Sequence, residues 1–373
     1  MLISRNLPAA RGRKENVIVY SSGFAEIATR FSTALSRHYD VHLFVRENNF
    51  KIEVEDVGLF LPSSLKVTKL RRPSYLHVLP RILLSLFMRR PAYVFVEETT
   101  ERRLPTYVWL FGKFSQVWLR VHDPEAHSGN DRAIADGASK RTAWIRENVD
   151  VALLHGGYCT GVFSRHYRTK VHTTTHGVVL DPGDESVARP KSNRFLMFGR
   201  MEAYKGLDTL LSALKLLLAR GIAPEVILAG RGDELDRLAT EFVALPNVQV
   251  LNEFIPTRRL VELIQGCDAV LLPYLDATQS GVVAAAFANG RPVVASRVGG
   301  IPDVVSHGES GLLVSPGNAD ELARAMETLM ANGELWERLE NGARHAAKVN
   351  LCWDNIVEDI VSVLHKSRSP KSD

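Results

Sequence analysis

The stretch FLMFGRMEAYKGLDTLL, residues 195–211, holds the pattern that decides the fold. It begins with four apolar residues, passes through a loop with two glycines and two cations, and enters a segment whose leucines recur at helical spacing. An uninterrupted apolar run is typical of a strand buried on both faces of a parallel sheet. Leucines three and four residues apart predict one apolar face of a helix. The stretch therefore predicts one strand–loop–helix unit of an α/β domain.

The same alternation continues in both directions from this stretch. In the first half of the chain the predicted strands are Val17–Tyr20, Val41–Val45, Tyr93–Val96, Val117–Val121 and Val151–Leu154. In the second half they are Phe195–Phe198, Val226–Ala229, Val248–Leu251, Ala269–Leu272, Pro292–Ala295 and Leu312–Val314. Helical segments separate them, one of them opening at Ala319 with two acidic residues. Such a repeat predicts two doubly wound, Rossmann-like α/β domains.

A stretch rich in proline, glycine, serine and charge, GVVLDPGDESVARPKSN (177–193), interrupts the pattern. It carries no apolar period and predicts a linker. We therefore expect a first domain over residues 1–178, a linker over 179–194, a second domain over 195–350 and a closing helix over 351–373. Ligands of open α/β sheets bind beyond the carboxyl ends of the strands, so the cleft between the two domains is the expected site.

Composition and charge narrow the class of protein. The 373 residues are 45% hydrophobic and 24% charged, as in soluble globular proteins. Residues 1–180 carry 26 Lys and Arg against 16 Asp and Glu, a net charge of +10, and the remainder carries −6. The three cysteines form no metal-binding pattern. The longest apolar stretch is too short for a membrane span, and the first residues lack the apolar core of a secretion signal, so we expect a cytoplasmic protein.

Two loops of the second half suit a phosphate group. Gly199, Arg200 and Lys205 follow one predicted strand, and two cations beside a glycine suit a diphosphate. Residues 280–282 (Ser-Gly-Val) begin a helix of small residues, where free backbone N–H groups bind anions. The alternatives are solvated surface charge for the first loop and an ordinary capped helix for the second.

The ordered set of motifs in the second half resembles retaining glycosyltransferase family 4. The set comprises GR-x4-KG, LAGRGDE, CDAVLLPY, SG-x8-GRPVVAS, VGGIPDVV and GLLV-x-PG, and the resemblance runs from about residue 195 to 330. The segment LCWDNIVEDIVSVL (351–364) is similar to the closing helix of the family, which crosses back to the first domain. The resemblance implies the GT-B fold, with two Rossmann-like domains and the active site between them.

The resemblance also implies a nucleotide-diphosphate sugar as donor, no cofactor and no metal. It assigns Arg200 and Lys205 to the diphosphate as catalytic groups. Two glutamates of the family are missing here: Asp276 and Gln279 are the nearby polar groups that can replace the sugar contact of one, and nothing obvious replaces the ribose contact of the other. Many members carry those glutamates where this chain has Ala277 and Ala285, which leaves the donor identity open. The full set of residues expected at the donor is Gly23, Gly199, Gly230, Phe254, Ile255, Asp276, Gln279, Ser280, Gly281 and Val282.

The first half holds a second candidate site, VHDPEAHSG, directly after the strand Val117–Val121. By the resemblance, His122 lines the reaction centre and contacts the donor sugar, as a catalytic residue that is not a nucleophile. Asp123 and His127 are candidate acceptor contacts. A structural role is the alternative for each, and a His/Asp metal site lacks a third ligand.

The segment KVTKLRRPSYLHVLPRILLSLFMRR, residues 66–90, combines basic residues with an apolar stretch. It predicts either peripheral contact with an anionic membrane or a helix packed in the core. Nucleic acid is disfavoured as a partner, because no recognition motif accompanies the basic residues.

The sequence as a whole predicts a metal-independent hexosyltransferase that uses a nucleotide sugar and a glycan or lipid-linked acceptor. Polysaccharide or surface glycoconjugate synthesis is the expected pathway, at the cytoplasmic face of the membrane. The alternatives are a non-catalytic subunit that binds nucleotide or a partner enzyme, and a GT-B sugar-nucleotide epimerase. A phosphorylase shares the fold but is disfavoured, because this sequence has no recognisable lysine for pyridoxal phosphate.

Overall fold

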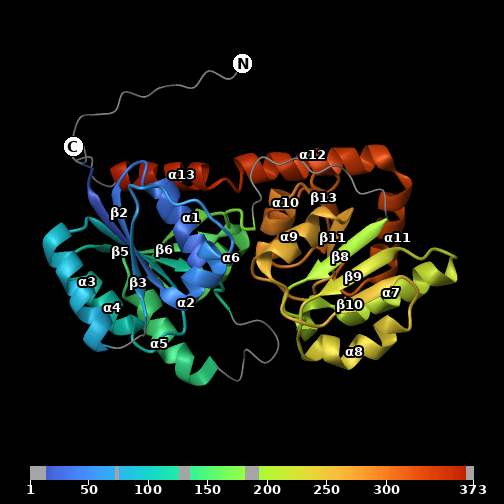
Figure 1. Cartoon of the computed structure of the whole chain (residues 1–373), viewed down its shortest axis with the longest axis horizontal. Coiled ribbons are helices and arrows are strands. Elements are labelled where there is room, and N and C mark those ends of the chain that lie inside the picture. Colours follow the sequence, from blue (N-terminus) through green and yellow to red (C-terminus); the bar gives the residue numbers. More distant parts are fainter. Residues whose placement is uncertain (1–13, 72–74, 126–134, 181–192, 367–373) are drawn as a thin grey trace, which may run out of the picture.

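A computed structural model describes residues 14–71, 75–125, 135–180 and 193–366, which form two α/β domains lying side by side (Figure 1). The elements of the first domain are β1 (Asn16–Ser21), α1 (Ala25–Leu35), β2 (Asp40–Arg46), α2 (Glu47–Phe50), η1 (Lys51–Glu55), β3 (Lys66–Leu70), α3 (Tyr75–Arg89), β4 (Tyr93–Glu97), α4 (Leu104–Phe111), β5 (Gln116–Val121), α5 (Ala135–Glu147), β6 (Val151–His155), α6 (Gly156–His166) and β7 (Lys170–Thr174).

The second domain and the closing helices follow in the same alternating order. Their elements are β8 (Arg194–Phe198), η3 (Ala203–Lys205), α7 (Leu207–Ala219), β9 (Glu225–Ala229), α8 (Asp233–Val243), β10 (Val248–Leu251), α9 (Thr257–Gln265), β11 (Ala269–Leu272), α10 (Gly281–Ala288), β12 (Val293–Ser296), η4 (Ile301–Asp303), β13 (Gly311–Val314), α11 (Ala319–Ala331), α12 (Gly333–Val349) and α13 (Trp353–Lys366).

Each domain is built on one parallel sheet. The first sheet has the strand order β3-β2-β1-β4-β5-β6-β7 and the second the order β10-β9-β8-β11-β12-β13. The strand order reverses between β1 and β4 in one sheet and between β8 and β11 in the other, and these reversals are the points where open α/β sheets bind ligands. The prediction of two doubly wound parallel-sheet domains is confirmed.

All predicted strands form, within a residue or two at their ends, but two strands of the first sheet were missed. β3 and β7 lie at the two edges of that sheet, and each is exposed or partly exposed except at its buried last residue. Their sequences, KVTKL and KVHTT, are mostly polar. An edge strand needs no continuous apolar run, so the pattern that predicted the central strands could not predict these.

The basic and apolar segment 66–90 is divided between two elements. Its first five residues form the edge strand β3, so they do not belong to a membrane-lying helix. The remainder contains α3, whose buried residues Val78, Ile82 and Leu86 pack in the core of the first domain. The opposite side of α3 keeps four large apolar side chains exposed, at Leu83, Leu84, Phe87 and Met88.

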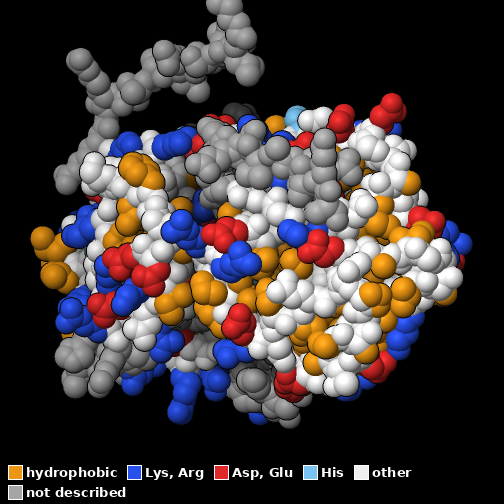
Figure 2. Space-filling view, turned by 45° about the vertical axis from the view of Figure 1, so that its right-hand side comes forward, with side chains coloured by type: hydrophobic (Ala, Val, Ile, Leu, Met, Phe, Trp, Pro, Cys, Tyr) orange, Lys and Arg blue, Asp and Glu red, His pale blue; other side chains and the backbone are white. Residues whose placement is uncertain are grey.

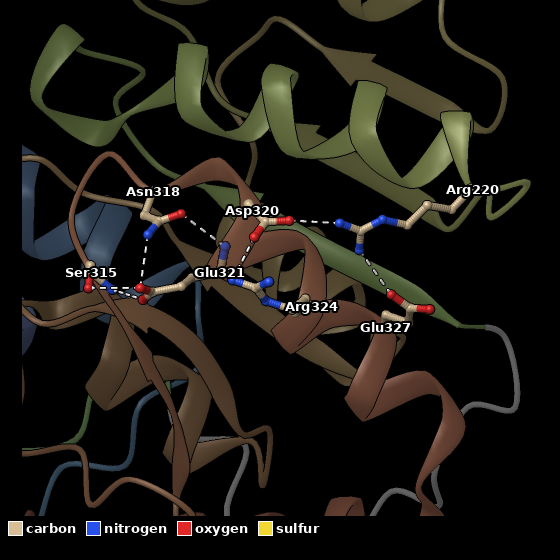
Figure 3. A network of polar contacts seen from close by, with 7 residues as sticks. All are labelled: Arg220, Ser315, Asn318, Asp320, Glu321, Arg324 and Glu327. Atoms are coloured by element: carbon tan, nitrogen blue, oxygen red, sulfur yellow. Dashed lines mark hydrogen bonds and ion pairs between the residues drawn. The ribbon is translucent and has the colours of Figure 1, made fainter.

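The two acidic residues predicted to open a helix do so at the start of α11 (Figure 3). Asn318 caps this helix by accepting a hydrogen bond from the Glu321 backbone N–H, while the Glu321 carboxylate accepts one from the Ser315 backbone N–H at 2.7 Å. Such reciprocal capping stabilises a helix start by about 1 kcal/mol. Arg220, at the end of α7, bridges Asp320 and Glu327 and so ties α7 to α11.

The last helix crosses from the second domain to the first. α12 lies along α10, and α13 lies beside α1 of the first domain (Figure 1). Trp353, the first residue of α13, donates from Nε1 to the carbonyl oxygen of Val178 at 2.8 Å. The linker predicted over residues 179–194 falls mostly outside the described residues.

Both signs of charge are interspersed over the face drawn in Figure 2, with apolar side chains in small groups between them. The net charges of the two halves therefore do not appear on this face as one basic and one acidic region. No helix in the described ranges is both long and apolar enough to cross a membrane.

Candidate active site

The loop after β8 carries the two cations that were predicted to bind a diphosphate. β8 ends at Phe198, and the chain turns through Gly199 into η3, which ends at Lys205. Gly206 follows with a φ of 72°, and a Cβ atom there would lie 2.0 Å from the carbonyl oxygen of Pro273. Only glycine permits this approach, so Gly206 sets the lysine beside the end of β11.

Lys205 is a buried lysine without an acidic partner. Its residue is 5% exposed, and its Nζ donates to the carbonyl oxygen of Phe198 at 3.4 Å and to the hydroxyl of Tyr274 at 3.0 Å. Both partners are uncharged, and no described acidic residue forms an ion pair with Lys205. Burial is the main cause that lowers the pKa of Lys205 from 10.5 to about 8; the charge of Arg200 acts in the same direction, while Tyr204 and Glu202 act against it. A desolvated ammonium without a counterion is unfavourable, which indicates a site that binds an anion.

Arg200 supplies a second cation near the start of the same loop, directly after Gly199. Its side chain is exposed, and none of the described residues forms a hydrogen bond or ion pair with it. Because its charge affects the pKa of Lys205, the two cations act on the same region. Together they offer a point charge and a planar donor group, a combination that suits a diphosphate.

The helix α10 begins beside this loop with unused hydrogen-bond donors. The backbone of Ser280 is extended, and its side chain does not cap the helix. The side-chain oxygen of Gln279 is buried without a hydrogen-bond partner among the residues described. The first N–H groups of a helix lack partners within it and carry a partial positive charge. This helix start, at Gly281 and Val282, can therefore bind an anion together with the lysine.

On the first domain, His122 stands at the end of β5 within a buried polar network. Its Nε2 lies 2.8 Å from Oε2 of Glu97, whose Oε1 accepts a hydrogen bond from Arg120 at 2.8 Å. Although burial raises the pKa of Glu97, the charge of Arg120 and the bond to His122 hold that pKa below its usual value. The ionised carboxylate fixes the ring of His122 through one nitrogen and leaves the other for a ligand.

Two aromatic rings lie against the imidazole ring of His122. Phe24 stacks on His122 with ring centroids 4.0 Å apart, and His155 lies 5.6 Å away on centroids. His176 continues this row, 5.3 Å from His155, and its ring reaches the start of α10, within 3.7 Å of a Cβ placed on Gly281. Burial lowers the pKa of His176 to about 4, so this ring is neutral at physiological pH.

The two domains touch on this side of the site. Asp303 of η4 accepts a hydrogen bond from the backbone N–H of Tyr158 at 2.9 Å, at the start of α6. Thr278 donates its hydroxyl proton to Asp123, and its carbonyl oxygen accepts from the thiol of Cys159 at 3.3 Å. These contacts place the loop before α10 against the first domain, so both domains contribute to one site.

The other residues predicted at the donor are spread over the same edge of the sheets. Gly230 follows β9, and a Cβ there would lie 1.9 Å from the carbonyl oxygen of Gly199, so the two loops are in contact. Phe254 is exposed in the loop after β10, while Ile255 packs partly on the core. Gly23 lies between β1 and α1, in contact with Thr99.

The predicted acceptor residues have different outcomes. Asp123 bonds to Thr278 of the other domain, so at least one of its oxygens joins the domains rather than facing an acceptor. His127 lies outside the described residues. Asp276, which was predicted at the donor sugar, is half-buried in the loop before α10.

Two alanines stand where many members of the family that the sequence resembles carry glutamates, and both are packed into the core. Ala277 and Ala285 are both 1% exposed. A Cβ on Gly299 would lie 1.5 Å from the carbonyl oxygen of Ala277, so the backbone around this position is tightly closed. An ionised carboxylate at either position would be buried, which is unfavourable without a partner. The loop is thus adapted to its alanines, and Gln279 is the neighbouring side chain with an unused polar atom.

Glu97, Arg120 and Phe24 were not predicted as site residues. Glu97 is the last residue of β4 and lies directly after the predicted strand Tyr93–Val96. The rule that site residues follow strands would have identified it. Arg120 was counted as part of an apolar strand, and Phe24 as part of an ordinary turn, so only the structure connects them to His122. No group of three or more metal-ligating side chains occurs in the part of the chain that the structure describes.

Two Rossmann-like domains with facing strand ends and a closing helix that crosses back define a GT-B protein. The structure of sucrose-phosphate synthase from Thermosynechococcus elongatus is similar, with a TM-score of 0.71 at 16% identity over 95% of this chain and 99% of that chain. That of Anabaena HepE in complex with UDP-glucose has a TM-score of 0.66 at 17% identity over 94% and 99%.

Residues 192–332 match the family model described as Glycosyl transferases group 1. A D-inositol 3-phosphate glycosyltransferase of Stackebrandtia nassauensis is 32% identical over 213 residues, 52% of this chain and 48% of the relative. An uncharacterized glycosyltransferase of Methanocaldococcus jannaschii is 30% identical over 45% of this chain and 43% of the relative. The matches thus span about half the length of these relatives.

Proposed function

We propose that this protein is a retaining glycosyltransferase that moves a hexose from a nucleotide-diphosphate sugar to a glycan or lipid-linked acceptor. The single observation that carries the proposal is Lys205, a buried ammonium with neutral partners at the start of a helix and beside Arg200. The anion that completes this site is the donor diphosphate. HepE, which shares the fold, was solved with UDP and with UDP-glucose, and this is consistent with such a donor.

The placement of these groups supports a reaction whose retention of configuration is taken from the family resemblance. The bond between the anomeric carbon and the phosphate oxygen breaks, and the electron pair leaves with the diphosphate. The acceptor hydroxyl forms the new bond on the same face and gives its proton to the departing phosphate oxygen. Lys205, Arg200 and the backbone N–H groups at the start of α10 stabilise the charge that develops on the leaving group. His122, held by Glu97, orients the sugar.

A panel of nucleotide sugars tests the proposal. The purified full chain is titrated with UDP-, GDP-, ADP- and CDP-hexoses by calorimetry, and nucleotide release is then measured with and without glycan and lipid-linked acceptors. We expect one nucleotide to bind and its release to increase with acceptor, with the anomeric configuration retained in the product. If no nucleotide binds, the proposal is wrong. Product analysis also separates transfer from epimerisation of the donor.

A second candidate is a subunit that binds nucleotide without transferring sugar. Its support is the pair of buried alanines, Ala277 and Ala285, at the positions of the usual carboxylates. The same panel separates the two candidates, since this one predicts nucleotide binding without release or product for every donor and acceptor.

Replacing His122 with alanine tests the reaction centre. We expect kcat to fall by about 10²-fold, because one positioned polar group at the reacting sugar is lost. The affinity for nucleotide should change by less than about threefold, since His122 lies on the other domain. His166→Ala, which removes an exposed histidine, is the matched control. A large drop in the melting temperature of His122→Ala with unchanged kcat per folded molecule would instead make this histidine structural.

We further propose that the exposed apolar side of α3 touches an anionic membrane on which a lipid-linked acceptor lies. Leu84 and Phe87 are exposed on this side, and Arg81 and Arg90 flank it. Apolar groups between arginines bind anionic lipid surfaces. In vesicle sedimentation with 30% anionic lipid, the Leu84→Glu/Phe87→Glu variant should bind about tenfold less than the natural chain. Val243→Glu, at an exposed apolar residue of the second domain, should bind normally. Equal sedimentation of all three proteins would contradict the proposal.

A further inference from the structure

A cavity lies in the first domain, and neither Arg200 nor Lys205 of the second domain lines it. Its volume is about 340 Å³, within the usual range of about 300–1,000 Å³ for small-molecule sites. It lies at the carboxyl ends of β1, β2 and β4, the edge at which open α/β sheets generally bind ligands. The polar and charged residues of its wall include Tyr20, Ser22, Arg46, Glu101, Arg102 and Arg103.

Arginines dominate the charge of this cavity. Arg46 ends β2, and Arg102 and Arg103 precede α4, so they approach the cavity from two directions. Neither Arg46 nor Arg102 forms an ion pair or hydrogen bond with any residue that the structure describes. Glu101 is the one acidic side chain among the described lining residues, and it accepts a hydrogen bond from the Tyr20 hydroxyl at 2.9 Å. Arg46 and Arg102 together exceed the charge of this carboxylate, so the described part of the cavity wall is net positive.

The cavity adjoins the reaction centre through one short segment of chain. Ser22 lines the cavity, and its hydroxyl lies 2.7 Å from that of Thr99, another lining residue. Two residues further along, Phe24 stacks on His122 at 4.0 Å. The cavity and His122 therefore lie at the same edge of the first sheet, beyond the carboxyl ends of its strands. An acceptor whose hydroxyl reacts beside the histidine would bind at this edge.

We propose that the cavity binds a phosphate group of the acceptor, with Arg46, Arg102 and Arg103 as its ligands. The inference rests on the proposed function and adds the acceptor class, a phosphorylated sugar or sugar-lipid. A planar guanidinium group binds two phosphate oxygens through a pair of hydrogen bonds. Several guanidinium groups around one cavity therefore match the negative charge and the three exposed oxygens of a phosphate group. The phosphate stays intact and serves to position the acceptor.

The same phosphate chemistry has two sources, a soluble sugar phosphate or a lipid-linked diphosphate. We test them with glucose 6-phosphate and farnesyl diphosphate as probes, and with glucose as the neutral comparison. Each is titrated by calorimetry into the full chain carrying Arg200→Gln, which removes one cation of the other anion site. Nucleotide affinity of the natural chain is measured beside them, so that failure of the proposed function is seen separately.

We expect at least one phosphorylated probe to bind and glucose to bind at least tenfold more weakly. Adding Arg46→Gln and Arg102→Gln should raise the dissociation constant of that probe at least tenfold, and the preferred probe identifies the source. Arg168→Gln, an exposed arginine at the opposite edge of the sheet just before β7, should change it less than twofold. Equal binding with and without Arg46 and Arg102, or no binding of either probe, would overturn the inference while leaving the donor site untouched.

Discussion

Replacing Lys205 with methionine is expected to lower kcat/KM by about 10³-fold without lowering the free energy of unfolding. The loss of activity follows because a preorganised cation in a water-excluded site stabilises the leaving diphosphate strongly. Stability is preserved because the ammonium is buried beside neutral groups, the carbonyl of Phe198 and the hydroxyl of Tyr274. Methionine fills a similar volume with no charge to desolvate. We expect the unfolding free energy to be unchanged or higher by about 1–2 kcal/mol.

The control for this variant is Lys215→Met on α7, where the lysine is exposed and paired with Glu241. It should keep both activity and stability within error. Chemical denaturation and steady-state kinetics on the same samples measure both quantities. If Lys205→Met is destabilised by several kcal/mol, the lysine is a structural group. If it keeps normal transfer, the assignment to the diphosphate is wrong.

The pH dependence gives an independent check on the same lysine. Its pKa of about 8 in the folded protein lies below the ordinary value of 10.5. Below pH 8 the ammonium is charged, so nucleotide affinity should be constant there and weaken by up to about tenfold per pH unit above. The free energy of unfolding of the nucleotide-free protein should change in the opposite direction to the affinity. Between pH 8 and 10.5 the lysine is protonated in the unfolded chain but not in the folded one, so the folded state becomes more stable as pH rises. Both dependences should vanish in Lys205→Met.

Replacing Trp353 with alanine should destabilise the protein by about 3–5 kcal/mol, which is typical of a buried tryptophan. This residue is 7% exposed, and it donates a hydrogen bond to the carbonyl of Val178. A Cβ on Gly177 would lie 2.2 Å from its ring, so the chain between the domains fits closely around it. The guanidinium of Arg120 also lies 5.4 Å from the ring centroid, which connects this tryptophan to the network of Glu97.

The matched control is Trp109→Ala, since Trp109 is 55% exposed on α4 and its removal should change stability by about 0.5 kcal/mol or less. Urea denaturation followed by far-UV circular dichroism compares the two variants. Gly177→Ala should be destabilised in the same direction, because the new methyl group would meet the ring. An effect of Trp353→Ala no larger than that of Trp109→Ala would show that α13 does not hold the domains together.

Part of the candidate site follows from local sequence. Gly199, Arg200 and Lys205 lie within one loop between a predictable strand and a predictable helix, so their common location needed no tertiary information. The start of α10 is local in the same way. The edge strands β3 and β7 were not predictable by the same rule, because their polar residues reflect solvent on one side rather than burial.

The sequence by itself determined the class of fold and the cations of the donor loop, since apolar periodicity and short motifs depend only on neighbouring residues. Only the tertiary structure decided how His122 is held and how the domains meet. Glu97 is 25 residues from His122, and Thr278 is 155 residues from Asp123. Contacts between such distant residues arise when strand ends gather at one edge of a sheet and two domains close on each other. Local patterns carry no information about which distant side chains then become partners.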